Sequence, residues 1–435
     1  MLEKEESQLN QAKEVLDKIE IPIDKLDASI LNGLQKGKQL KKKKKQKKTW
    51  MISIISAALL FIGFTSLLSV SPAFADAIAK IPGMENFVDV FKSNKGYSDA
   101  AENHYLEKIN STQEKQGIKV TIDSAIKDES GMVIFYTIES DKNLTEMKVE
   151  MMGLYDQQKQ SLLEGSSYTS GRGFANIKKA EKQSDKFEFD HVNLSGVKDF
   201  TLKLKVHKLD FSFDFNLKKQ VFMKKYQVNK MVSIEQQNVF IKSVTLYPLR
   251  ADVHLAIDQS KNSKVLLEFE DMRLVDENGE IWGKIADGMT GSGGSDGQDR
   301  HIYLQSNYFK KPKELYLMVN KIQALPLNHS KLVVDTIKQQ IIDAPDIRIQ
   351  NIKVSGHTVE FSFITNKDFH YSIFGDITDA TGKKIDVATS FTSGGGEERR
   401  IGFELPNNQP FQNPISIKLN YYPKWINDDV KLQIK

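Results

Sequence analysis

The segment IKVTIDSAIKDESGMVIFYTIE, residues 118–139, is typical of a pair of antiparallel β-strands. It contains two runs in which apolar and polar residues alternate with period two, as half-buried strands do. Similar pairs of runs occur at 232–257 and 347–365. The chain therefore contains a β unit that recurs along the sequence.

Other features follow each pair in a constant order. A strand running into an acidic turn comes next, then a loop of small residues, then two strands around a turn. The turn aspartates are 120 and 103 residues apart, at Asp156, Asp276 and Asp379. Asn278-Gly279 and Thr381-Gly382 have the chemistry of hairpin turns. A period of roughly 100–120 residues with about six or seven short strands favours immunoglobulin-like antiparallel β-sandwiches.

We therefore expect a mainly β fold with tandem immunoglobulin-like β-sandwich modules. The predicted modules are residues 117–230, 231–343 and 344–435. The repeat is one of pattern and not of identity, which leaves open that the middle module shares strands with its neighbours. About three domains is also the natural expectation for 435 residues.

A long apolar segment precedes this region. Thr49 to Ala75 contains no charged residue, and the 21 residues from Trp50 to Val70 are long enough for a transmembrane helix. The ending SPAFAD also resembles a secretory cleavage site, with Ala73, Ala75 and Asp76 as the processing site. Signal peptides have shorter apolar regions near the start of the chain, so residues 49–75 favour an uncleaved anchor.

Charge predicts the orientation of this span. Residues 1–49 contain 13 Lys against 8 Asp and Glu, and residues 76–435 contain 48 basic against 49 acidic residues. Lysines concentrate on the cytoplasmic side of a span, which predicts a single-pass cell-membrane protein with a cytoplasmic N-terminus and an extracytoplasmic C-terminus. The lysine run next to the span suits membrane lipid, and no direct nucleic-acid contact is expected.

Residues 76–116 are expected to form a partly helical stalk. Ser98 has the position of an N-cap for a helix that ends near Gly117. We expect this stalk to pack on the outer membrane surface or on the first module.

Composition argues against an enzyme. The chain has no cysteine, which excludes disulfides, thiolate metal sites and cysteine nucleophiles. None of the eight histidines is two to four residues from another, so no metal-ligand pair is visible. No phosphate-binding glycine motif or nucleophile elbow is present, and we expect no cofactor, metal or catalytic residue.

Residues 1–48 are expected to form a short helical cytoplasmic tail. Leu16 and Ile19 belong to a narrow apolar seam, and a second helix after Asp24 places Leu26, Ile30 and Leu34 on one face. Helices this short are marginal in water, so these apolar residues predict binding to a partner protein or to the membrane surface. The alternative is a disordered tail with chance periodicity.

Three segments, 19–45, 71–87 and 105–139, resemble a bacterial family of membrane anti-sigma factors, negative effectors of ECF-type sigma factors. The last two are similar to that family's extracytoplasmic domain of unknown function. The resemblance implies that the tail binds an ECF-type sigma factor and that the outer part senses envelope conditions. Many such proteins use a zinc-binding His/Cys motif in the tail, but this chain has no Cys and no His before His104.

The implied mechanism is a helix-in-groove contact that holds the sigma factor at the membrane. A membrane protease would then cut near Ala73–Asp76 and release the tail. The alternative function is a cell-surface binding or adhesion protein, whose modules grip wall polymer or protein while the tail only fixes topology. A cleaved, secreted form is a third reading, and the outer ligand is not identified by the sequence.

Overall fold

The computed structural model describes residues 84–435, except 146, 164–166, 171–175, 191, 193, 220–221, 286–289, 294–297 and 366–368. The chain divides into two compact units, Met1–Ser71 and Pro72–Lys435, and every described residue belongs to the second unit. The predicted tail, the predicted span, and the processing residues Ala73, Ala75 and Asp76 all lie outside the described residues. Within the described part, no helix combines the length and the apolar character needed to cross a bilayer.

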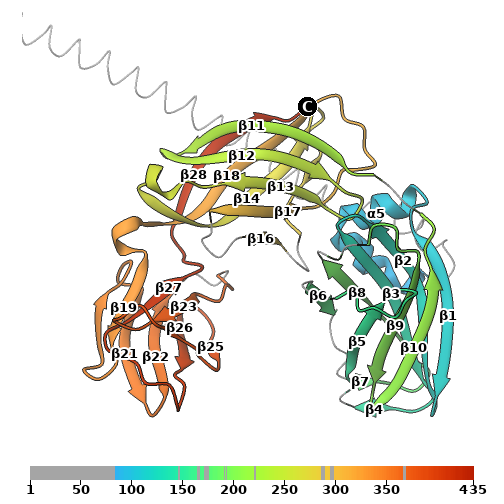
Figure 1. The fold of residues 1–435 in the computed structure, drawn as a ribbon, viewed down its shortest axis with the longest axis horizontal. Coiled ribbons are helices and arrows are strands. Elements are labelled where there is room, and N and C mark those ends of the chain that lie inside the picture. Colours follow the sequence, from blue (N-terminus) through green and yellow to red (C-terminus); the bar gives the residue numbers. More distant parts are fainter. Residues whose placement is uncertain are drawn as a thin grey trace, which may run out of the picture. The chain divides into compact units, whose positions relative to one another are not determined.

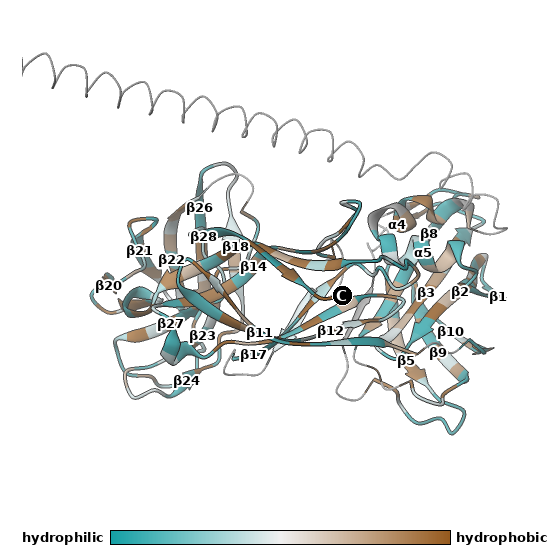
Figure 2. Cartoon of the chain, turned by 90° about the horizontal axis from the view of Figure 1, so that it is seen from above, coloured by the Kyte–Doolittle hydropathy of each residue, from teal (hydrophilic) through white to brown (hydrophobic). Residues whose placement is uncertain are grey.

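The described residues form a mainly β structure of several antiparallel sheets, which confirms the predicted fold class at that level (Figure 1). Many strands alternate between hydrophilic and hydrophobic residues along their length (Figure 2). Only short helices occur among these residues, and those near the start are η1 (Glu85–Phe87), α4 (Val88–Ser93) and α5 (Lys95–Glu102). The finer assignment of immunoglobulin-like sandwiches stays a prediction.

The first module has two main sheets around one apolar cluster that includes Val120, Ile134, Leu202 and Phe213. The larger sheet has the order β1 (Glu107–Lys115), β2 (Ile118–Asp128), β3 (Gly131–Ser140), β8 (Lys182–Asp190) and β6 (Ser167–Ser170). The smaller sheet has the order β10 (Leu209–Asn216), β9 (Asp199–Val206) and β5 (Val149–Tyr155). A short ladder joins β4 (Leu144–Thr145) to β7 (Asn176–Ile177).

The second module repeats this plan around a cluster that includes Trp282 and Ile426. One sheet has the order β11 (Lys224–Ile234), β12 (Gln237–Leu246), β13 (Ala251–Ala256), β17 (Asp299–Leu304) and β16 (Gly291–Gly293). The other has the order β15 (Ile281–Trp282), β14 (Lys264–Asp276), β18 (Leu315–Pro326) and β28 (Trp425–Gln433). A short 3₁₀ turn, η2 (Gln259–Lys261), precedes β14, and a second, η3 (Leu327–His329), follows β18.

The third module has its own cluster, which includes Phe361, Phe403 and Ile417. Its four-stranded sheet has the order β21 (Ile349–Ser355), β22 (Thr358–Ile364), β26 (Glu398–Glu404) and β25 (Ser390–Ser393). Its five-stranded sheet has the order β20 (Gln340–Asp343), β19 (Lys331–Asp335), β27 (Ile415–Leu419), β23 (Phe374–Thr378) and β24 (Lys384–Ile385).

The third module is inserted into the second. The chain leaves the second module after β18, builds the third module, and returns as β28, which pairs with β18 from Tyr316↔Gln433 to Gln323↔Trp425. Figure 1 shows β28 in red beside β18. The middle module is thus completed by residues that follow the third.

The observed sheets differ from the predicted boundaries at both ends of each module. β1 belongs to the first module, β11 to the second, β19 and β20 to the third, and β28 to the second. The helix predicted from Ser98 to about Gly117 is wrong, because α5 spans Lys95–Glu102 and residues 107–115 form β1. β1 is a polar edge strand whose ladder with β2 outweighs its weak local propensity.

The three acidic turns have one hydrogen-bond pattern. In each, the backbone N–H of the aspartate donates to the carbonyl four residues later, at 3.1 Å for Asp156, 3.2 Å for Asp276 and 2.9 Å for Asp379. In each, the aspartate Oδ1 also accepts the N–H of that later residue, at 2.8, 2.8 and 3.0 Å. The repeat read from the sequence is therefore also a repeat of local geometry.

The fourth residue of each turn has a left-handed backbone. The φ angles are +62° at Lys159, +83° at Gly279 and +83° at Gly382. Glycine adopts this conformation without steric cost, so the first module carries a lysine where the other two have the residue that the turn favours.

Candidate functional site at the joint between the first two modules

The short helices near the start of the described chain pack on the outer face of β3. Ile134 and Tyr136 face the core of the first module, whereas Phe135 between them faces the helices. The ring centroids of Phe87 and Phe91 lie 5.4 Å and 5.0 Å from that of Phe135, and the Tyr97 ring lies at 6.2 Å. Full burial of such side chains contributes roughly 1.5–3 kcal/mol each. We call residues 84–102 the stalk helices.

Local sequence explains how the stalk helices turn. Asn94 caps α5, since its side chain accepts the N–H of Gly96 at 2.9 Å. The hydroxyl of Ser98 donates back to the carbonyl of Phe91 at 2.7 Å and ties α5 to α4. Among the described residues, the stalk helices lie against the first module, and α5 begins at Lys95, three residues before the predicted N-cap Ser98.

The stalk helices also contact the second module. Lys95 donates to the carbonyl of Ile281 at 2.7 Å, and its ammonium lies 5.6 Å from the Trp282 ring. A Cβ added at Gly96 would lie 3.1 Å from the Leu249 carbonyl oxygen and 3.1 Å from the Ser306 Cβ. The small residue at position 96 therefore permits this close approach of α5 to the second module.

Asp99 and Lys310 form a half-buried ion pair between α5 and the second module, with 3.1 Å between carboxylate and ammonium. Burial raises the pKa of Asp99 to about 6, although Lys310 opposes this shift. The second carboxylate oxygen, Oδ2, has no hydrogen-bond partner within the described residues, which is consistent with a disfavoured charged form.

The first and second modules also touch directly. Arg250, in the turn between β12 and β13, forms an ion pair with Asp190 at the end of β8. Asp128 at the end of β2 accepts the N–H of Leu249 at 2.8 Å. We call the contacts of Asp128 and Asp190 with Leu249 and Arg250, together with the stalk helices, the joint.

The charges in the joint are shielded from water. Burial raises the pKa of Asp128, although hydrogen bonds from Ser130 and Leu249 oppose the shift. Burial alone would lower the pKa of Arg250, but the nearby Asp190 and Asp128 together raise it. The Arg250 guanidinium also lies 5.3 Å from the Tyr303 ring centroid. A buried guanidinium such as that of Arg250 is expensive unless its carboxylate partners stay in place.

A cavity of about 500 Å³ opens beside the joint, lined by residues of both modules. His301 on its wall stacks on His254 with ring centroids 4.3 Å apart. His301 Nδ1 pairs with Asp252 at 2.9 Å and His254 Nε2 with Asp299 at 2.6 Å. The hydrogen bond that His301 donates to the Asp252 carboxylate raises the pKa of His301. The described residues contain no group of three or more His, Asp or Glu placed to hold a metal ion.

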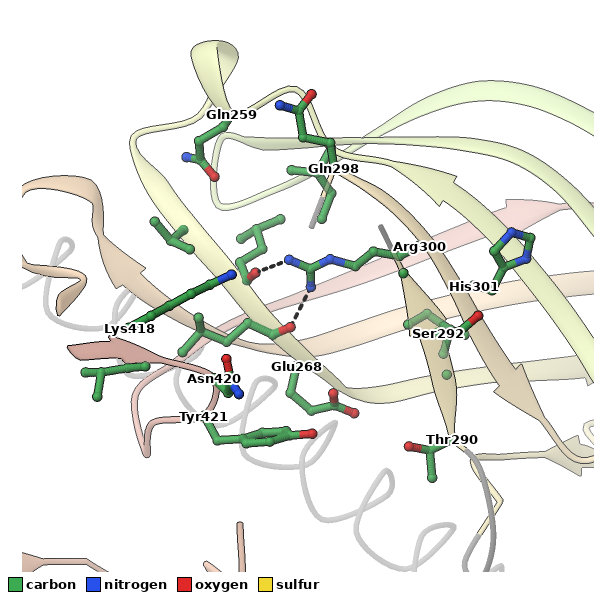
Figure 3. Close-up of a pocket in the computed structure, with 18 residues that line it drawn as sticks. Gln259, Glu268, Thr290, Ser292, Gln298, Arg300, His301, Lys418, Asn420 and Tyr421 are labelled. Carbon is green, nitrogen blue, oxygen red and sulfur yellow. Dashed lines mark hydrogen bonds between the residues drawn. The ribbon is translucent and has the colours of Figure 1, made fainter. Parts of the chain in front are cut away.

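A second cavity, of about 740 Å³, lies where β14 and β17 meet residues 418–421 of the third module (Figure 3). Arg300 points into it, and its guanidinium donates to the carbonyls of Leu267 at 2.6 Å and Leu266 at 2.8 Å. The β14–β18 ladder has a register shift after Leu266, so Arg300 bonds carbonyls beside an irregular stretch of that ladder. Burial lowers the pKa of this guanidinium. These two hydrogen bonds join β17 to β14.

The predicted partner-binding residues Leu16, Ile19, Leu26, Ile30 and Leu34 lie outside the described residues, as do Ala73, Ala75 and Asp76. The structure therefore does not test them. The joint was not predicted from the sequence. One signal for it was present: Met132 to Tyr136 reads MVIFY without a polar residue, which is typical of a strand buried on both faces.

Two segments match known families. Residues 44–140 match a domain of unknown function, DUF4179, and residues 223–349 match a family of unknown function, DUF5643. The first match ends with β3, and the second runs from the start of the second module to the first residue of β21. No curated protein matches the chain.

One solved structure with partial similarity is the crystal structure of the conserved domain protein from Bacillus anthracis. The two chains are 16% identical in sequence. The match covers 55% of this chain and 84% of the chain in the solved structure, with a TM-score of 0.34. A similarity this low carries no argument about function.

Proposed function

We propose that the chain is a single-pass membrane anti-sigma factor. Residues 1–48 bind an ECF-type sigma factor in the cytoplasm, residues 49–75 cross the membrane, and the outer modules respond to envelope conditions. The resemblance of segments 19–45, 71–87 and 105–139 supports this proposal. The match of residues 44–140 to one family is also consistent with it, because that segment joins the lysine run, the apolar run and the stalk helices.

The burial of the stalk helices is the observation that carries the proposal. Phe87 and Phe91 follow the predicted span closely in sequence, and both side chains are 0% exposed against the first module. Lys95 and Asp99 hold the same helices to the second module. A ligand or stress that separates these modules would therefore break the contacts of Lys95 and Asp99. Loss of those contacts would loosen the segment that leads to the span.

In this mechanism, Leu16, Ile19, Leu26, Ile30 and Leu34 form the apolar face that binds the sigma factor. Freeing of the stalk helices exposes the segment at Ala73, Ala75 and Asp76 to a membrane protease. Cleavage then releases the tail and its sigma factor. No step requires a cofactor or catalysis by this chain.

Co-purification of residues 1–48 with each ECF-type sigma factor of the same genome tests the proposal. We expect one sigma factor to bind, and substitution of Leu26, Ile30 and Leu34 by Asp to abolish binding. Substitution of Ala28, Asn32 and Gln35 by Asp is the matched control, since it adds the same charge on the opposite helix face. Failure of every sigma factor to bind would overturn the proposal.

The alternative is a cell-surface binding or adhesion protein, and the cavity beside Arg300 is the observation in its favour. Gln259, Asn420 and Tyr421 line that cavity and offer polar and aromatic contacts to a ligand. The two functions differ in one test in cells. If the Leu26, Ile30 and Leu34 substitutions leave transcription unchanged while binding outside the cell persists, the alternative is correct.

A further inference from the structure

The connection between β10 and β11 presents two apolar side chains to solvent. Phe222 is 73% exposed and Met223 is 47% exposed. The backbone that carries them is held in place, because the Phe222 carbonyl accepts the Tyr308 hydroxyl at 2.9 Å. The N–H of Met223 donates to the Glu129 carboxylate at 3.2 Å. Exposed large apolar residues on an anchored backbone indicate an interaction surface.

Lysines surround these two residues. Five of them are exposed: Lys218, Lys225, Lys311, Lys313 and Lys435. Lys224 is partly buried among them, with its ammonium 4.0 Å from the Tyr308 ring centroid. Burial lowers the pKa of Lys224, and the charges of Lys311 and Lys435 lower it further. These three lysines come from separate parts of the chain and lie close together. We call these residues, with Lys219, Lys310, Phe222 and Met223, the linker patch.

Carboxylates lie among the lysines of the linker patch. Asp99, Glu102 and Glu280 lie near Lys310, and Glu129 lies near Tyr308. Glu107, Glu129 and Glu277 accept backbone N–H groups, and Asp99 pairs with Lys310. Lys225 and Lys311 are exposed, and Lys311 lies near Lys224, the residue that follows Met223.

The linker patch lies against the end of the stalk helices. The ammonium of Lys219 donates to the carbonyl of His104, and the Tyr105 ring lies 5.7 Å from that of Phe309. Met84, where the described chain begins, is nine residues beyond Ala75. Nine residues extend about 30 Å at most, so a span ending near Ala75 keeps Met84 within that distance of the end of the span.

We propose that the linker patch is a membrane-contact surface of the outer modules, in which Phe222 and Met223 enter the headgroup region and the lysines contact anionic lipid. The inference rests on the proposed transmembrane anchor. Apolar insertion combined with several basic residues is the usual chemistry of peripheral lipid binding. An acidic wall polymer would engage the lysines but would leave both apolar side chains in water, so the bilayer is the better fit.

Single cysteines test this contact, because the chain has no cysteine of its own. The full chain is reconstituted in phosphatidylcholine vesicles with and without phosphatidylglycerol. A polarity-sensitive fluorophore is attached in F222C, in G63C within the predicted span, or in I347C in the third module. Ile347 is 86% exposed and serves as the matched control for Phe222. Spin-labelled lipids report contact with the bilayer by quenching.

We expect strong quenching at positions 63 and 222 and none at 347. Quenching at 222 should increase several-fold with phosphatidylglycerol and decrease in a K225E/K311E double variant. The pair K338E/K383E, at exposed lysines of the third module, should not change it.

Quenching at 63 without quenching at 222 overturns the linker patch and leaves the anchor intact. Absence of quenching at both positions overturns the anchor and the inference together. A third result also overturns the inference: a blue shift of the 222 label with a soluble anionic wall polymer and no quenching by lipid. That outcome would assign the patch to the polymer.

Discussion

Arg250 of the second module and Asp190 of the first form an ion pair whose side chains are only 6% and 2% exposed. Asp128, also in the first module, holds the neighbouring backbone through Leu249. Two carboxylates and one guanidinium are therefore withdrawn from water at the contact between modules. The contact is specific, because a buried charge is tolerated only while its partner stays in place.

Substitution of Arg250 by Met should destabilise the first two modules by about 3–5 kcal/mol, because Asp190 stays buried without its partner. Urea unfolding at pH 7 measures the change. Arg400 is the control, since its ion pair with Glu360 spans 3.8 Å and its side chain is 66% exposed. The Arg400→Met variant should lose about 1 kcal/mol or less. Equal losses in the two variants would show that the joint is not a buried charge site.

Substitution of Asp190 by Leu in the Arg250→Met background should recover part of this loss. Replacement of a whole buried ion pair by apolar residues is often neutral or stabilising. A double variant that is less stable than either single variant contradicts this account. The same unfolding experiment measures it.

Substitution of Phe91 by Ala should loosen the stalk helices. The ring is fully buried and stacks on Phe135, and removal of such a ring costs about 3–5 kcal/mol. Limited proteolysis followed by mass spectrometry should show faster cleavage within residues 84–105. Ile347→Ala is the control at an exposed apolar residue, and it should leave the cleavage rate unchanged. Unaltered cleavage of the Phe91 variant would rule out docking of these helices through Phe135.

Asp99 should make stability depend on pH. Its pKa in the folded protein is raised from 3.8 to about 6 by burial, so the folded protein binds this proton more readily than the unfolded chain does. The stability contribution of Asp99 therefore falls as the pH rises from about 4 to about 6, by about 3 kcal/mol at most.

The variant Asp99→Asn lacks this titration. We expect the difference in unfolding free energy between wild type and variant to shift against the wild type as the pH rises through this window. Urea unfolding at several pH values between 4 and 7 checks it. A difference that stays constant with pH would contradict the raised pKa.

Introducing glycine into one acidic turn should stabilise the protein, whereas removing glycine from another should destabilise it. Lys159 has φ of +62°, so Lys159→Gly should relieve a strain of about 1–2 kcal/mol and lose less than that in chain entropy. Gly382 has φ of +83°, and a Cβ added there would meet no other atom within 4 Å. Backbone strain alone should therefore make Gly382→Ala destabilising, by about 1 kcal/mol. Thermal unfolding of both variants measures the two signs. Gly395, which also has open space but no positive φ, is the control position for Ala.

Local patterns predicted much of the fold. Alternation at 118–139 corresponds to β2 and β3, and the spacing of Asp156, Asp276 and Asp379 corresponds to three turns with one geometry. These features depend on residues close in sequence. The order of strands in the middle module does not, because β28 pairs with β18 across the whole third module. No local pattern in Trp425–Gln433 specifies that partner.

The joint could not be predicted for the same reason. Asp190 and Arg250 are ordinary charged residues in the sequence, and only the meeting of two modules gives them a partner and removes water. His254 and His301 are likewise far apart in the chain, and the β13–β17 register places them opposite each other. Contact between modules created the first group, and pairing between strands created the second.

The return of the chain through β28 sets an order for folding as the chain is made. Domains fold as units, and those made first usually fold first. The first and third modules each have a continuous set of strands, whereas the second lacks β28 until residues 425–433 emerge. During synthesis, therefore, the central module is the last to close, and its open edge at β18 is exposed to chaperones or to misassembly until then. A premature stop before residue 425 would spare the cores on either side and leave the piece between them unfinished.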